Sequence, residues 1–156
     1  MKKEIIELGK KDIMNIVEEA TKQVLHEREI LNEMARVGYI DGQLEVYVKT
    51  NDGGNVPHVH IRDTNTQGRL FETCVELAQN KYFLHGYIND ILSKKQCKAF
   101  NKFMHDEIHT RTYNGTVYEF AVDMWNRNNS NTNIEVQYDT EDKPIIPDYT
   151  NIELNK

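Results

Sequence analysis

The chain has 156 residues, of which 38% are hydrophobic and 28% are charged, and its formal net charge is −6. This length suits one domain with a single hydrophobic core. The acidic balance lacks the basic field of a general nucleic-acid-binding protein, so nucleic acid is not favoured as a partner. No apolar run approaches the roughly 20 residues of a membrane span, so no membrane partner is expected.

The cysteine content and the first residues both bear on location. The stretch MKKEIIELGKKD lacks the apolar core of about 7–15 residues that a signal peptide carries. Two cysteines, Cys74 and Cys97, are too few for a disulfide scaffold or an all-cysteine zinc site. In a reducing compartment they are expected to be free thiols. We therefore predict a cytoplasmic protein.

Residues 11–37 are predicted to form a long helix that ends at Gly38. Its apolar residues recur three or four positions apart, with one interruption: Ile13, Val17, Ala20, Val24, Leu31 and Met34. This narrow stripe suits packing within the domain or against a second copy of the same helix. A homodimer through residues 11–37 is therefore one of two predicted arrangements.

A small antiparallel β-meander of three to four strands is predicted next. Leu44, Val46 and Val48 alternate with polar or aromatic residues, as on a half-buried strand. The turn NDGGN leads to the strand VPHVHIR, where Pro57 marks a strand start or an edge. A third strand is predicted at 69–77, and a short strand or turn follows at 81–90.

Two helices and an extended tail complete the predicted α+β domain. Capping boxes at Ser93/Gln96 and Thr116/Glu119 indicate helices over 93–108 and from 116 to about 129. Residues 130–156 hold two basic and six acidic side chains, an asparagine-rich stretch and two prolines. We predict one domain over 1–129 followed by an acidic, extended tail over 130–156.

The histidines of GNVPHVHIRD carry the chemical interest of the sequence. His58 and His60 are two residues apart on a strand, so their side chains share a face at a backbone separation of about 7 Å. With a third ligand they could hold a divalent metal, and His85 is the predicted third ligand. Two alternatives need no cofactor: a polar, solvated strand face, or histidines that hydrogen-bond to their neighbours and hold a loop.

Other candidate chemistry is weaker. His105 and His109 lie one turn apart on the predicted helix, but Glu107 is one position too late for a zinc-protease motif. Cys97 falls on the apolar face of that helix and is predicted to be buried. The exposure of Cys74 is left open by the sequence. We assign no catalytic residue.

Four short segments follow in order: Pro-His-x-His at 57–60, Tyr-Phe-x-His at 82–85, Trp-Asn-x-Asn-Asn at 125–129 and Pro-Asp-Tyr at 147–149. Together they resemble a family of uncharacterised small proteins of bacteria, phages and mobile elements, often encoded beside toxin–antitoxin genes. The resemblance covers residues 43–152 and implies candidate positions but no activity. We predict that several of them converge on one polar pocket. Its predicted members are His58, His60, Tyr82, His85, Trp125, Asn126 and Asn129.

Three functions are compatible with these features. The first is a non-enzymatic factor of a phage or mobile element, antitoxin-like or anti-defence (such as an anti-CRISPR), that binds a host or cognate protein. The second is a metal-dependent hydrolase of nucleotides or nucleic acid that uses His58, His60 and His85. The third is a small-ligand binding module. Small size, acidity and the lack of catalytic motifs favour the first.

Overall fold

The computed structural model describes residues 34–41, 43–50, 56–63, 71–83 and 90–154. They belong to one compact unit, Met34–Lys156. Most of the predicted N-terminal helix, with its dimer stripe, lies outside the described residues, and so does His85.

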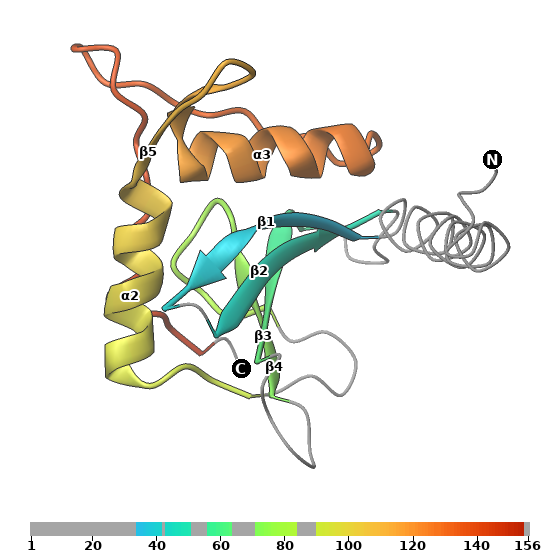
Figure 1. The fold of residues 1–156 in the computed structure, drawn as a ribbon, viewed down its shortest axis with the longest axis vertical. Helices are drawn as coiled ribbons and strands as arrows, with labels where there is room; N and C mark the ends of the chain where they lie inside the picture. Colours follow the sequence, from blue (N-terminus) through green and yellow to red (C-terminus); the bar gives the residue numbers. More distant parts are fainter. Residues whose placement is uncertain (1–33, 42, 51–55, 64–70, 84–89, 155–156) are drawn as a thin grey trace, which may run out of the picture. The chain divides into compact units, whose positions relative to one another are not determined.

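Four strands form one antiparallel sheet in chain order, which confirms the predicted meander (Figure 1). They are β1 (Met34–Ile40), β2 (Leu44–Lys49), β3 (His58–Asp63) and β4 (Glu72–Glu76). With the two helices described below, the chain has the predicted α+β fold. The predicted helical end at 34–37 is wrong, because these residues belong to β1, and Met34, Ala35 and Arg36 pair with β2. Pairing with a neighbouring strand overrides the helical spacing there.

Gly38 has a packing role instead of ending a helix. It lies opposite Val46, just after a register shift that begins at Arg36. A Cβ atom at this position would lie 2.8 Å from Cζ of Phe103, on the following helix. A side chain at position 38 would therefore require the Phe103 ring to shift.

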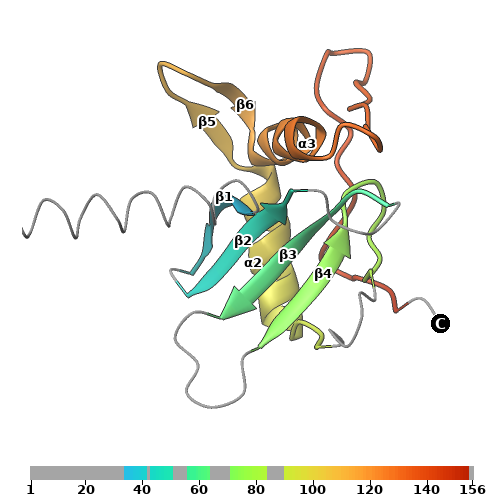
Figure 2. The ribbon, with the colours of Figure 1, turned by 90° about the vertical axis from the view of Figure 1, so that its right-hand side faces the viewer.

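Two helices flank the sheet, and both begin at the predicted capping boxes. Helix α2 (Lys94–His105) is capped by Ser93 and Gln96, and α3 (Val117–Asn128) by Thr116 and Glu119. Helix α2 covers one face of the sheet, and α3 crosses the end where β2 stops and β3 starts (Figure 2). The described part of the chain has no helix with the length and apolar composition of a membrane span.

The prediction that the first of these helices continues to residue 108 is wrong. Asp106 is extended (φ −64°, ψ 148°), and β5 (Glu107–His109) then pairs with β6 (Asn114–Thr116) in a hairpin. His105 and His109 therefore do not share a helix. His109 Nε2 lies 2.9 Å from Glu107 Oε1, and His105 Nδ1 lies 2.8 Å from the Asn101 carbonyl.

The sheet presents an apolar layer to α2. Directly opposed residues of neighbouring strands share a face of the sheet, so the register decides which side chains form this layer. The side chains of the layer are all buried, and they are Leu44, Val46, Val48, Val59, Ile61, Thr73 and Val75. From α2 the layer receives Cys97, Phe100 and Met104, which are also buried. Burial of Cys97 was predicted from its position on the helix.

The segment after α3 runs back along the molecule and contributes to the core. Trp125 Nε1 donates to the Thr132 carbonyl at 2.7 Å. Tyr149 is fully buried, its ring centroid lies 4.8 Å from that of Phe100, and its hydroxyl donates to the Leu77 carbonyl at 2.8 Å. The predicted tail thus contains a core residue.

Candidate metal centre

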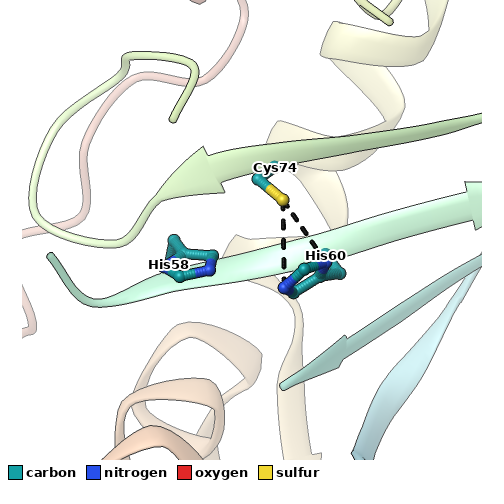
Figure 3. A group of neighbouring side chains, drawn as sticks. All are labelled: His58, His60 and Cys74. Carbon is teal, nitrogen blue, oxygen red and sulfur yellow. Dashed lines mark hydrogen bonds between the residues drawn. The ribbon is translucent and has the colours of Figure 1, made fainter. Parts of the chain in front are cut away.

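His58 and His60 share one face of β3, as predicted, and that face is buried. Both side chains lie on the opposite side of the sheet from α2 (Figure 3). Each histidine has 0% of its surface exposed. The prediction that they decorate a solvated strand face is therefore wrong. A buried imidazole needs partners for its ring nitrogens, so the neighbours decide its chemistry.

Cys74 joins the two histidines because β4 pairs with β3 in a register that sets it directly opposite His60. Its Sγ atom lies 3.3 Å from His60 Nδ1 and 3.9 Å from His60 Nε2 (Figure 3). Cys74 is 1% exposed. One ligand atom from each of His58, His60 and Cys74 lies within 4.8 Å of the other two.

The ring of His58 is oriented by a backbone carbonyl. His58 Nδ1 lies 2.7 Å from the Val56 oxygen. A carbonyl oxygen only accepts, so Nδ1 carries the proton and the lone pair is on Nε2. The ring also packs against Phe83 and Trp125, with centroid distances of 4.4 and 5.1 Å.

The ring of His60 is oriented by a carboxylate. His60 Nδ1 lies 3.0 Å from Glu72 Oε2, and the ring stacks on Tyr47 at 5.0 Å between centroids. The Tyr47 hydroxyl donates to the same Glu72 oxygen. Burial raises the pKa of Glu72, but the hydrogen bonds from His60 and Tyr47 more than offset this, so its net pKa is below the ordinary value. Burial and the Glu72 bond raise the pKa of Tyr47.

A second polar cluster lies on the same face, nearer β1. Glu45 accepts from Arg36 Nε at 2.7 Å and from Arg62 Nε at 2.9 Å. Burial raises the pKa of Glu45, but the two arginines outweigh it and the net pKa is lowered. The Arg62 guanidinium lies 4.9 Å from the centre of the Tyr47 ring. The two arginines compensate the negative charge of Glu45 within this cluster. The Tyr47 ring connects the cluster to His60, because it contacts Arg62 and stacks on the His60 ring.

The donor set fits a transition metal in both chemistry and spacing. Zinc binds imidazole nitrogen at about 2.0–2.1 Å and thiolate sulfur at about 2.3 Å, so ligand atoms of a tetrahedral site lie about 3.3–3.6 Å apart. The separation of 3.9 Å between Cys74 Sγ and His60 Nε2 is close to this value. The three ligand atoms as a set lie within 4.8 Å of one another, so the side chains would move closer together on binding a metal. Histidine ligands usually donate their second ring N–H to a carbonyl or carboxylate, as both do here.

The structure brings some members of the predicted pocket together and places others elsewhere. His58, His60 and Trp125 converge. Tyr82 is buried on another side, where its hydroxyl accepts from the Leu92 amide at 2.9 Å.

Two asparagines of the predicted pocket hold backbone. Asn126 exchanges two 2.8 Å hydrogen bonds with the backbone of Ile134. Asn129 Nδ2 donates to the Lys49 carbonyl at 2.8 Å and so ties the end of α3 to β2. Asn126 thus attaches α3 to the segment that follows it, and Asn129 attaches the end of the same helix to β2.

Sequence reasoning missed Cys74 and Glu72 as members of the site. A usable signal existed, because Thr73 and Val75 alternate with them along the strand predicted at 69–77. If that apolar face joins Val59 and Ile61, then Cys74 and Glu72 must share the face of the histidines. What the sequence lacked was the register between the two strands.

Comparisons with known proteins give no match, whether to protein-family models, to curated proteins or to solved structures.

Proposed function

We propose that the protein binds one transition-metal ion, with zinc as the first candidate, through His58, His60 and Cys74. The observation that carries this proposal is the convergence of three buried ligand atoms within 4.8 Å. Two imidazoles and a thiolate suit zinc or copper, whereas magnesium and calcium prefer oxygen ligands. Manganese is disfavoured for the same reason.

Burial supports a stabilising role for the metal. All three ligands are at most 1% exposed, so a nucleotide-sized substrate has no access to them in this conformation. A bound metal would link β3 to β4 beneath the ring of Trp125. Binding to the folded state alone then stabilises it, by about 2.7 kcal/mol when free metal is at 100 times Kd.

Metal content and thermal unfolding test the proposal. We expect about one zinc per chain in tag-free protein and a lower melting temperature after chelation. Cys74→Ala should abolish both effects, because zinc loses its thiolate. Cys97→Ala is the matched control, since Cys97 is also buried but belongs to α2, on the opposite side of the sheet from the histidines. Metal-free protein that takes up no added zinc, with melting unaffected by chelation, would contradict the proposal.

Trp125 provides a local readout. It is the only tryptophan of the chain, and its ring centroid lies 5.1 Å from that of His58. Titration with cobalt(II) should quench its fluorescence with an end point of one ion per chain. The His58→Ala/His60→Ala double variant should not respond.

Several sequence-based predictions remain open. His85→Ala in the same titration tests whether His85 is a further ligand.

Pull-down from lysate tests the predicted protein-binding role in a phage or mobile element, and a thermal-shift library tests the small-ligand module. Size determination in solution tests the homodimer predicted through residues 11–37.

A further inference from the structure

We infer that Glu72 determines the metal specificity of this site: it holds His60 in the binding orientation and supplies the charge that favours a divalent ion. This assignment rests on the proposed function. Glu72 would not touch the metal, so it is a positioning residue that acts through His60.

The two ring nitrogens of His60 lie at different distances from Cys74. Cys74 Sγ is closer to Nδ1, at 3.3 Å, than to Nε2, at 3.9 Å. With Glu72 accepting from Nδ1 at 3.0 Å, Nδ1 keeps the proton and Nε2 carries the lone pair for a metal. Without Glu72, a Cys74 thiol that donates to Nδ1 would place the ring proton on Nε2 instead. Glu72 thus selects the nitrogen that can share a metal with Cys74.

The carboxylate is itself held in place. The Tyr47 hydroxyl donates to the oxygen that His60 contacts. The backbone amide of Glu72 donates to Asp90 Oδ2 at 3.0 Å, which fixes the start of β4. Glu72 and Cys74 are two residues apart on this strand, so they share a face. One strand therefore supplies both the thiolate and the outer carboxylate.

Glu72 also contributes negative charge to a buried site. Buried charges are tolerated when they are compensated within the same site. With a metal bound, the Cys74 thiolate and the Glu72 carboxylate, whose side chain is 17% exposed, would carry two negative charges, and Lys49 partly balances the second. Zinc(II) offsets more of this charge than copper(I) does. Of the other acidic groups on this face, Glu45 is already paired with Arg36 and Arg62, and Glu76 lies opposite His58.

Glu72→Gln separates charge from shape, because the amide oxygen can still accept from His60. We expect zinc affinity to fall by about 10- to 100-fold, the range seen when outer partners of metal ligands are changed. Copper(I) affinity should change by much less, so the ratio of the two affinities is the decisive readout. Both constants are measured by competition with chromophoric chelators.

The controls distinguish a specific role from general damage. Glu45→Gln removes a comparable carboxylate on the same face and should leave both affinities unchanged. Tyr47→Phe keeps the charge but loosens Glu72 and should lower zinc affinity less than Glu72→Gln does. In the cobalt(II) form of Glu72→Gln, the sulfur-to-cobalt charge-transfer band should persist, because Cys74 still binds.

The outcomes separate this assignment from the proposed function. If the unsubstituted protein binds zinc and Glu72→Gln binds it equally well, or loses zinc and copper(I) in equal proportion, Glu72 has no such role and the metal site stands. If Glu72→Gln is unfolded, Tyr47→Phe with unaltered zinc affinity overturns the assignment. If the unsubstituted protein binds no metal, the proposed function and this assignment both fail.

Discussion

The two faces of the sheet are both buried, but by different chemistry. The face toward α2 is built of aliphatic side chains such as Val46 and Ile61, whereas the opposite face holds His58, His60 and Cys74. Burying an aliphatic side chain stabilises a fold by about 1.5–3 kcal/mol without any specific partner. A buried polar group costs about 1–3 kcal/mol when it is left unpaired. Burial of the apolar face therefore stabilises the fold without specific partners, whereas burial of the polar face requires a partner for each polar group.

The largest expected effect separates the two faces by their dependence on metal. Phe100→Ala empties a fully buried position in the layer of α2 and should lower the free energy of unfolding by about 3–5 kcal/mol. Urea unfolding should show the same loss with zinc and with chelator. Exposed Lys98 on the same helix is the control, and Lys98→Ala should change stability by less than about 0.5 kcal/mol. A loss seen only with zinc would show that the faces are coupled.

A hydroxyl within the apolar layer tests whether polar groups there are also held by partners. Tyr149→Phe leaves the carbonyls of Glu76 and Leu77 without its hydroxyl, so we expect a loss of about 1–3 kcal/mol in chemical unfolding. Tyr138→Phe is the control, because Tyr138 is half-exposed and its hydroxyl donates to Glu119 at 2.5 Å. Equal losses in the two variants would mean that burial of Tyr149 adds nothing to its hydrogen bonds.

The smallest effect concerns the ion-pair cluster on the polar face. Because the folded pKa of Glu45 is below the ordinary 4.5, its stabilisation is present above that value and is lost as pH falls through the folded pKa. Glu45→Gln should cost about 1 kcal/mol or less at pH 7, since the side chain of Arg36 is 56% exposed. The two proteins should become equally stable in acid. A difference that persists in acid would assign the effect to packing instead of charge.

Much of the fold followed from local sequence, for physical reasons. Capping at Ser93 and Thr116 depends on side chains three residues away, so it can be predicted without knowing the tertiary structure. Alternation along β2 predicted that Leu44, Val46 and Val48 share one face of the strand, and all three are buried. Local patterns failed at residues 34–37 and at Ile108, where pairing with the next strand along the chain overrode helical spacing.

The candidate site also combines features that local sequence determined with features that tertiary packing decided. That His58 and His60 share a face was determined by their spacing on a strand alone, because strand geometry fixes it. Cys74 and Glu72 joined them only through the register of β4 against β3, which pairs His60 with Cys74, 14 residues further along the chain. Burial of the site likewise came from the tertiary structure, because it requires α3 to place Trp125 over His58. The sequence thus determined which residues share a strand face, and tertiary packing decided which of them meet.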